Sequence, residues 1–396
     1  MTETWLDGAA CAEKLGVKAQ TLYAYVSRGR IQARPDPDDS RRSLYSAQDV
    51  ARLQTRKARG RKAADVAQDA IAWGEPVLSS AITDVSAGGL RYRGLDAVTL
   101  AEEKGLEDVA LLLWGCDDPS VFSREPGPRV RMRGPAPARA FAGMAARAGG
   151  DAPALGRSPA TLWREGAGLV ADLAAALGDG AYEDGAHMSL ARAWGTGSVE
   201  ADLLRRTLVL LADHELNAST FAARVAASTG ASLAAAVLAG LAALSGPRHG
   251  GAGARVSALI DDAGRDGPQT AVEGWIARGE PLPGFGHVLY PDGDPRAGAL
   301  LEAFAPTPDL VALKASAEEV TGLPANIDFA LAAMTRTFGL PADAPFALFA
   351  LGRSVGWIAH ALEQLQTGGL IRPRARYVGP SPTPSPQRGE GGARSP

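Results

Sequence analysis

The sequence predicts a mainly α-helical protein, with a small module preceding a larger helical region. Alanine and leucine dominate residues 137–245, and the long runs there show helical spacing without β-branched alternation. The first 62 residues carry 13 Lys and Arg against 7 Asp and Glu, a net charge of +6. The remainder carries 28 against 37, a net charge of −9. A basic segment before an acidic body indicates two domains with different partners.

The composition is that of an ordinary globular protein. Of 396 residues, 46% are hydrophobic and 21% are charged, enough to bury a core in more than one domain. Two cysteines, Cys11 and Cys116, form no disulfide framework, which predicts a reducing, cytoplasmic location. Residues 1–20 lack the pattern of a signal peptide, and no apolar run predicts contact with a membrane.

The first module, residues 1–62, is predicted to be helical. Residues 5–28 read as two short helices around a turn at Gly16, with Asp7 capping the first. A further helix is predicted to begin in SLYSAQDVARL, residues 43–53. One inner face would gather the apolar positions Ala9, Ala12, Leu15, Val17, Leu22 and Val26.

This module resembles the winged helix-turn-helix of MerR-like and excisionase-like DNA-binding proteins. The resemblance implies that the second helix enters a major groove while arginines meet phosphates. The candidate DNA-binding residues are Thr21, Tyr23, Ser27, Arg28, Arg41 and Arg42. The alternative is a helical module that serves as a dimer contact or a lid, because fold alone does not give function.

The elements after the module follow from local pattern. Residues 55–70 are predicted to be a basic linker. In residues 73–94 apolar and polar side chains alternate around Gly88–Gly89, which predicts a β-hairpin. Helices are predicted over 100–115, ending on Gly115, and over 161–177, 201–216, 298–314 and 342–371. Residues 379–396 are rich in Pro, Ser and Gly, and predict a disordered tail.

Two histidines frame the stretch from His214 to Gly251. His214 is predicted near the end of the 201–216 helix, and small residues predict two close-packed helices after it. The turn GPRHGG then holds His249 between glycines, where either ring nitrogen can meet a ligand. Either histidine alone is more often a capping residue of a helix, but the pair around one apolar run, with glycines beside the second, favours a site.

A candidate base lies further along, in NIDF. Asp328 follows Pro324 at a predicted junction between a loop and a helix. Apolar neighbours, Ile327 and Phe329, would raise its pKa and make it a better base near neutral pH. Taken alone, this aspartate is more often a helix cap.

Several ordered motifs resemble the citrate synthase family. They are SAITDVSAGGLRYRGLDA (80–97), HELNAST (214–220), GPRHGG (246–251), GFGHVLYPDGDPRA (284–297), NIDF (326–329), GRSVGWIAHALEQ (352–364) and RPRARY (372–377). The resemblance implies a catalytic region over 63–378 with large and small helical domains, the small one inserted at roughly 255–340. This sequence departs from the family pattern at Val288, where many members carry arginine, and at Arg248, where an apolar residue is common.

The resemblance implies the condensation of acetyl-CoA with oxaloacetate and water to give citrate and CoA. Acetyl-CoA is then a substrate, and neither a cofactor nor a metal is expected. Asp328 matches the catalytic base. His249 matches the histidine that hydrogen-bonds the thioester oxygen. His287 matches the histidine that donates to the keto oxygen.

The same resemblance assigns the binding residues. His214 matches a substrate-binding histidine, and Arg296, Arg353 and Arg372 match the arginines that grip the dicarboxylate. The family equivalent of Arg372 reaches the neighbouring subunit's site, which implies a homodimer. Two alternatives stay open: a 2-methylcitrate synthase that uses propionyl-CoA, and a DNA-binding regulator whose synthase-like body senses a ligand.

Overall fold

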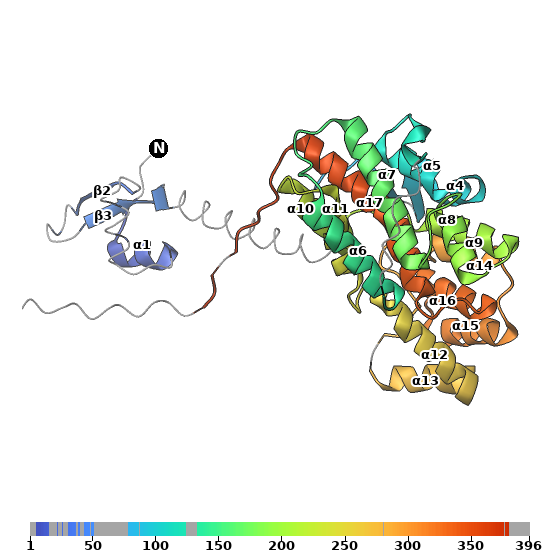
Figure 1. Ribbon diagram of the computed structural model, residues 1–396. Helices are drawn as coiled ribbons and strands as arrows, with labels where there is room; N and C mark the ends of the chain where they lie inside the picture. The colour runs from blue at the N-terminus through green and yellow to red at the C-terminus, as the bar shows by residue number, and fades with distance from the viewer. Residues whose placement is uncertain are drawn as a thin grey trace, which may run out of the picture. The chain divides into compact units, whose positions relative to one another are not determined.

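The chain falls into two compact units, Met1–Ser79 and Ser80–Pro396 (Figure 1). The computed structural model describes residues 5–15, 22, 26, 31–36, 39, 43–47, 49–50, 78–86, 88–123, 133–279, 281–375 and 377–379. All six candidate DNA-binding residues and residues 380–396 of the predicted tail lie outside the described residues. Because residues 51–77 also lie outside them, the domain boundary near residue 62 remains a prediction.

The first unit contains a small antiparallel sheet beside a helix. Strand β1 (Trp5–Leu6) pairs with β3 (Ser43–Ser46), which pairs in turn with β2 (Ala33–Pro35). Helix α1 (Gly8–Leu15) follows Asp7, whose Oδ1 accepts from the amide of Ala10 at 2.7 Å, so the predicted cap is confirmed. Among the described residues of this unit, the buried core contains Cys11, Leu15, Leu22, Ile31, Tyr45 and Val50.

One expectation for this unit is wrong, because Ala9 is exposed and Cys11 is buried on α1 together with Leu15. The sequence analysis also did not predict a strand at residues 43–46; the helix expected within 43–53 follows this strand, with Ala47, Asp49 and Val50 helical. Tyr45 is buried between two less buried neighbours, and this alternation suits a sheet with one covered face.

The second unit opens with the predicted hairpin, extended by a third strand. Strands β4 (Thr83–Ser86) and β5 (Gly89–Tyr92) pair in antiparallel register from Thr83↔Tyr92 to Ser86↔Gly89, and β6 (Leu95–Asp96) pairs with β5. Gly88 has a φ of 73°, a conformation that the turn requires and that glycine adopts without strain. The Tyr92 hydroxyl, buried beneath the sheet, donates to Val209 O at 3.0 Å and anchors the hairpin to the helices.

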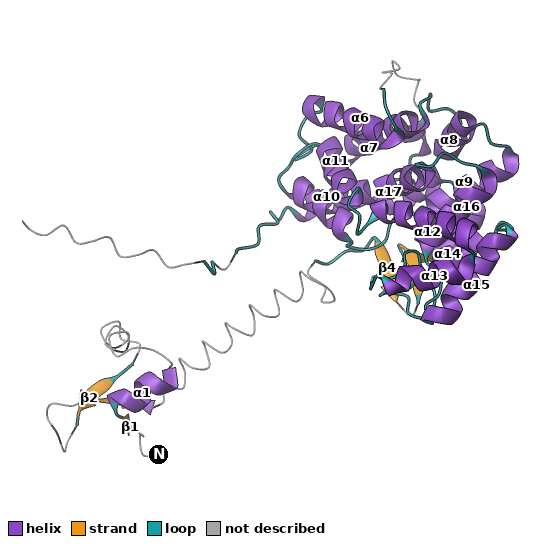
Figure 2. Ribbon diagram, turned by 90° about the horizontal axis from the view of Figure 1, so that it is seen from below, coloured by secondary structure: helices purple, strands orange, loops and turns teal. Residues whose placement is uncertain are grey.

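Helices form the rest of the second unit (Figure 2). The single helix predicted over 100–115 is two, because Gly105 interrupts it and caps the second half; Gly115 ends that half in the left-handed conformation. The helices are α4 (Ala97–Glu103), α5 (Leu106–Trp114), α6 (Ala136–Gly150), α7 (Pro159–Gly178), α8 (Ala186–Trp194), α9 (Ser198–Leu210), α10 (Ala218–Ser228), α11 (Leu233–Leu244), α12 (Gly253–Asp266), α13 (Pro268–Ala277), α14 (Pro295–Glu302), α15 (Pro308–Thr321), α16 (Ile327–Phe338) and α17 (Ala344–Thr367), with short 3₁₀ turns at Pro119–Phe122 and Gly250–Ala252.

Helix α17 is the central buried helix of this unit. It is buried along most of its length and packs against α5, α7, α9, α10, α11 and α16 (Figures 1 and 2). Glycines permit the closest approaches. A Cβ on Gly240 of α11 would lie 2.6 Å from Trp357 Cδ2, and one on Gly352 would lie 2.9 Å from Leu208 O. The small residues of the sequence therefore bring the helices around α17 to near backbone contact.

The position of His214 differs from the sequence prediction. Helix α9 ends at Leu210, so His214 lies in the turn before α10 and not in the helix. The backbone of this turn is hydrogen-bonded to α17: Gly356 N donates to Ala212 O at 3.1 Å, and Arg353 Nε donates to Leu211 O at 2.9 Å. These long-range bonds occupy carbonyls that a continued helix would use.

Helices α12 to α16 pack largely on one another, within the region predicted as the small domain. The second unit is nevertheless one compact body, and its division into large and small domains stays a prediction. Both cysteines are free and buried. Among the helices in the described residues, none has the length and apolar character needed to cross a membrane.

Candidate active site

Two predicted histidines meet around a tyrosine. The ring centroids of His214 and His287 lie 5.3 Å apart, and Tyr290 lies 5.5 Å from the first and 4.9 Å from the second. The Tyr290 hydroxyl is 3.0 Å from His214 Nε2. The turn before α10 and the loop before α14 thus place their polar side chains in one cluster.

The hydrogen bonds of His287 determine its tautomer. Its Nδ1 lies 3.1 Å from the backbone N–H of Leu289, which can only donate. Burial, helped by the charge of Arg296, lowers the pKa of His287, so the ring is neutral at neutral pH. The single ring proton therefore sits on Nε2, ready to be donated to a ligand.

Arg296 forms a buried bidentate ion pair with Asp294. Nε and Nη2 donate to the two carboxylate oxygens at 2.9 and 2.8 Å, and both side chains are at most 3% exposed. Asp294 also caps α14 and accepts from Ile327 N at 3.1 Å at the start of α16. Burial alone would raise the pKa of Asp294, but Arg296 outweighs it and lowers the pKa. This carboxylate thus joins the binding arginine to the helix that carries Asp328.

The GFGH and NIDF motifs lie side by side in the structure. Phe285 and Ala325 form an antiparallel bridge, and Gly286 N donates to Pro324 O at 2.8 Å. Asn326 Nδ2 donates to Gly286 O at 2.9 Å. Gly286 has a φ of 75°, and a Cβ there would lie 3.2 Å from Leu323 Cδ1, so the bridge requires glycine. Residues 40 apart in the sequence are therefore held in fixed register.

Asp328 lies in the first turn of α16, at the junction that the sequence predicts. Asn326 is the cap residue: its side chain accepts from Asp328 N at 3.0 Å, which leaves the Asp328 carboxyl free of the capping role. Burial raises the pKa of Asp328 to about 6; Arg296 opposes this shift and Asp294 adds to it. A carboxylate with this pKa is ionised at neutral pH and more basic than an ordinary aspartate.

Arg353 extends from the middle of α17 and is 1% exposed. Its Nε bonds Leu211 O, but in the described part of the chain its buried Nη2 has no hydrogen-bond partner. Burial lowers its pKa to about 10, with Asp213 opposing, so the group is charged at neutral pH. A buried guanidinium with an unused donor is suited to bind a carboxylate.

His249 lies in the GPRHGG turn, directly before the Gly250–Ala252 3₁₀ turn. Its Nε2 is 2.9 Å from Ser219 Oγ. That oxygen accepts from Trp357 Nε1 at 3.1 Å, and its own proton can be donated to His249 Nε2 or to Asn217 Oδ1, which is 2.7 Å away. Within the described residues, Nδ1 has no hydrogen bond to protein and is the nitrogen left for a ligand. Burial and the charge of Arg353 lower the pKa of His249 to about 4, so it too is neutral.

Arg372 is the one predicted site residue that no described contact brings to this cluster. It is exposed on the segment after α17, where the neighbouring Ile371 N donates to Ser228 Oγ at 3.1 Å. The six others, His214, His249, His287, Arg296, Asp328 and Arg353, are linked by the contacts and charges described above.

Sequence reasoning missed residues that hold the site together. Tyr290 and Asp294 lie inside GFGHVLYPDGDPRA, and Ser219 lies inside HELNAST, so motif position was a signal for all three. In a buried chain that runs from Arg224 through His360 to Asp213, His360 lies inside GRSVGWIAHALEQ, whereas Arg224 and Asp213 lie outside the motifs. Arg224 Nη1 donates to His360 Nδ1 at 3.3 Å, and His360 Nε2 lies 3.2 Å from Asp213 Oδ2, beside His214.

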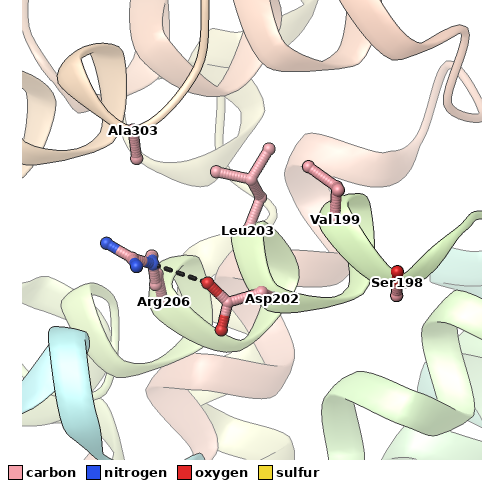
Figure 3. A pocket seen from close by; sticks show the side chains of 6 residues that line it. All are labelled: Ser198, Val199, Asp202, Leu203, Arg206 and Ala303. Carbon is pink, nitrogen blue, oxygen red and sulfur yellow. Dashed lines mark hydrogen bonds and ion pairs between the residues drawn. The ribbon is translucent and has the colours of Figure 1, made fainter.

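A separate hollow of about 520 Å³ lies between α9 and the end of α14. Figure 3 shows the side chains that line it, including Arg206 and Asp202, which are hydrogen-bonded to each other on α9. The residues that line it are Ser198, Val199, Asp202, Leu203, Arg206 and Ala303. None of these is a predicted site residue. Within the described residues, no group of three His, Cys, Asp or Glu side chains could hold a metal ion.

The fold and this cluster define a helical protein with buried arginines, neutral histidines and one carboxyl group of raised pKa in a single site. A family model described as the C-terminal domain of citrate synthase matches residues 179–374. The 2-methylcitrate synthase of Shewanella oneidensis is 30% identical, over 78% of this chain and 93% of that protein. The chain belongs to the citrate synthase family.

Further similarities differ in extent. The putative citrate synthase 2 of Mycobacterium tuberculosis is 39% identical over 47% of this chain and 53% of that protein. The chain thus spans about half the length of this and several other curated relatives. A citrate synthase from Thermoplasma acidophilum, in a ternary complex with carboxymethyl coenzyme A and oxaloacetate, is 26% identical with a TM-score of 0.63, covering 78% of this chain and 95% of that one. The fold of the Thermotoga maritima enzyme is similar, with a TM-score of 0.64 at 24% identity and coverage of 78% and 95%.

The Asp294→Asn variant tests the buried ion pair. We expect it to lower the free energy of unfolding by about 3–5 kcal/mol, because Arg296 would remain buried without a counter-charge. The difference from the parent should be complete above pH ~4 and vanish at lower pH, where Asp294 is itself protonated. Urea unfolding across pH measures both.

The control for this experiment is Asp261→Asn, which removes an exposed ion pair to Arg336. It should change the free energy of unfolding by less than about 1 kcal/mol. Equal losses for the two variants would contradict the role given to the Asp294–Arg296 pair.

Proposed function

We propose that this chain is an acyltransferase that condenses acetyl-CoA with oxaloacetate and water to give citrate and CoA. The observation that carries the proposal is the meeting of a carboxyl group of pKa about 6 with neutral histidines and two buried arginines. Membership in the citrate synthase family and a solved relative bound to oxaloacetate and a coenzyme A analogue support it.

The first step would be proton removal from the methyl group of acetyl-CoA. The Asp328 carboxylate takes the proton, and the electron pair of the C–H bond moves into the enolate. With the Ser219 hydroxyl donating to Nε2, the single ring proton of His249 lies on Nδ1, which would donate to the thioester oxygen on which the negative charge develops. Because His249 is neutral, it stabilises the enol form without a formal ion pair.

The second step would form the carbon–carbon bond. The enolate carbon attacks the ketone carbon of oxaloacetate, the electron pair of that C=O bond moves to its oxygen, and His287 Nε2–H donates its proton to this oxygen, which becomes the alcohol. Arg296 and Arg353 hold the two carboxylates; planar guanidinium groups give charge and orientation together. Closure of the small domain (roughly 255–340) over the substrates would exclude water before the carbon–carbon bond forms. Water then hydrolyses the thioester to a carboxylate and the thiol of CoA; the proton released returns to His287 Nε2, and Asp328 gives its proton to solvent.

Propionyl-CoA is the alternative acyl donor, and it would give 2-methylcitrate. One relative described above, 30% identical over 78% of this chain, carries the name 2-methylcitrate synthase. One extra methylene changes binding by only about 1–3 kcal/mol. Thiol release with oxaloacetate and each thioester, at matched concentrations, decides between the two by the ratio of kcat/KM.

We further propose a cytoplasmic homodimer in which Arg372 completes the site of the neighbouring subunit. Arg372 is exposed on an extended segment after α17, and Leu370, Tyr377 and Val378 on that segment are 60%, 76% and 82% exposed. Large apolar side chains so exposed are suited to an interface. A third arginine from this segment would add to Arg296 and Arg353.

For the first unit we propose binding to duplex DNA through a helix-turn-helix. The net charge of +6 in residues 1–62 supports it, since a basic surface attracts phosphates. The same charge supports a second candidate function for the whole chain, a regulator whose synthase-like body senses a dicarboxylate or acyl-CoA.

Asp328→Asn should abolish thiol release while oxaloacetate still binds, because the amide keeps the shape but cannot accept a proton. In the parent, kcat should fall as the pH drops through about 6, where the Asp328 carboxylate becomes protonated. Asp309→Asn, an exposed change in the first turn of α15, is the matched control. Near-parent turnover in Asp328→Asn would exclude it as the base.

Mixed dimers test the shared site. Arg372→Ala should weaken binding of the dicarboxylate, whereas Arg374→Ala, on the same exposed segment, should not. When one subunit carries Arg372→Ala and the other Asp328→Asn, the subunit with intact Asp328 receives an intact Arg372. One competent site should survive, about half the activity of a parent dimer. Inactive mixed dimers would argue against sharing.

Deletion of residues 1–62 separates the two functions. Citrate formation should survive, because every proposed catalytic residue follows position 210. The full chain should bind duplex with a log affinity that falls with log salt by roughly 0.9 per phosphate contact, and the deleted chain should not. If the full chain binds no duplex at low salt, the DNA-binding and regulator proposals both fail.

A further inference from the structure

Tyr290 lies at the centre of the candidate site, although no role has yet been assigned to it. It is 1% exposed, which is unusual for a large side chain in a loop. Its backbone is fixed at both sides, since Tyr290 N donates to His287 O at 3.1 Å and Gly293 N donates to Tyr290 O at 3.2 Å. The loop that presents His287 therefore also fixes Tyr290.

The tyrosine ring contacts His214 from the turn before α10 and also His287 and Arg296 from the GFGHVLYPDGDPRA segment. It packs against the rings of His214 and His287, and the Arg296 guanidinium carbon lies 5.6 Å from its centroid. Its hydroxyl approaches His214 Nε2 at 3.0 Å. Within the described residues, this is the one hydrogen bond of the Tyr290 hydroxyl and of the His214 ring.

The direction of this hydrogen bond follows from the protonation states. Burial and the charges of Arg296 and Arg353 lower the pKa of His214 well below its ordinary value, so the ring is neutral and carries one proton. Burial raises the pKa of the Tyr290 hydroxyl to about 12, so it also keeps its proton. A phenol is a stronger acid than a neutral imidazole N–H, and an imidazole nitrogen is the stronger acceptor. The favoured bond is therefore O–H···Nε2.

That direction places the ring proton of His214 on Nδ1. An anionic keto acid needs donors around it, and a neutral imidazole offers its donor on only one side. In the opposite tautomer Nε2–H would bond the phenol oxygen, and the lone pair of Nδ1 would repel the substrate's oxygens. A single hydroxyl group thus decides whether His214 attracts or repels the substrate.

We propose that Tyr290 is a positioning residue for substrate binding: its hydroxyl holds His214 in the Nδ1–H tautomer, so that His214 donates to the keto acid beside Arg296 and Arg353. The substrate in this statement rests on the proposed function. The tautomer itself does not, because it follows from contacts within this chain.

The tautomer can be observed directly in the whole protein by nitrogen NMR. With only five histidines, 15N-histidine labelling gives few signals, and the His214→Gln variant identifies those of His214. In the parent, Nδ1 of His214 should carry the proton and Nε2 should not. In Tyr290→Phe, which keeps the ring packing, both nitrogens should shift toward the average of two exchanging tautomers.

Kinetics gives the second measurement. Tyr290→Phe should raise KM for oxaloacetate about tenfold, the equivalent of one hydrogen bond, and change KM for the acyl-CoA less than about twofold. Tyr182→Phe is the matched control: it removes a hydroxyl bonded to Glu107 at 2.7 Å, away from this cluster. It should leave both KM values and the His214 signals unchanged.

Three results would overturn the proposal. They are a proton on Nε2 of His214 in the parent, unchanged His214 signals in Tyr290→Phe, and a Tyr290→Phe variant that loses thermal stability while the His214 signals and the KM for oxaloacetate stay unchanged. Should the parent show no synthase activity, the proposed function fails on its own. The nitrogen signals would still decide the tautomer, and calorimetric titration with oxaloacetate would replace KM as the measure of binding.

Discussion

The buried ion pair between Arg296 and Asp294 is the interaction on which the site depends. Two charges removed from water are tolerated only when they satisfy each other and when further donors complete the carboxylate. Asp294 receives Arg296 on both oxygens and also the backbone amide of Ile327. One carboxylate therefore fixes the start of α14, the start of α16 and the direction of a binding arginine. The position of Asp328 relative to Arg296 follows from this arrangement.

Helix α17 gives that arrangement a rigid support. Its glycines let the chain between α9 and α10 approach until Arg353 bonds Leu211 O and Gly356 N bonds Ala212 O. Buried hydrogen bonds from Arg224 to His360 and from His360 to Asp213 stabilise the turn that carries His214. Because an arginine can only donate, His360 accepts at Nδ1 and donates from Nε2 to Asp213. The site is thus built from turns whose backbones are bonded to a buried helix.

Charge and burial together set the chemistry of the site. Arg296 and Arg353 make the potential positive, and burial disfavours any further positive charge. The three histidines are neutral donors for this reason, with pKa values lowered by burial first and by the arginines second. Burial acts in the opposite sense on Asp328 and raises its pKa to about 6. The same low-polarity surroundings therefore keep the histidines neutral and make the Asp328 carboxylate a stronger base.

The sequence by itself determined the helical class, the hairpin around Gly88, the glycine end of α5 at Gly115 and the helix start before Asp328, because these depend on local pattern and capping. Its motifs also marked His214, His249, His287, Arg296, Asp328 and Arg353 as candidates. Only the tertiary structure decided that Gly105 splits one predicted helix, that residues 43–46 form a strand, and that His214 lies in a turn bonded to α17. It also decided which nitrogen of His287 carries the proton and what Tyr290 contacts. The physical reason is distance along the chain: these features depend on hydrogen bonds and packing between residues that are far apart in sequence, which local periodicity does not record.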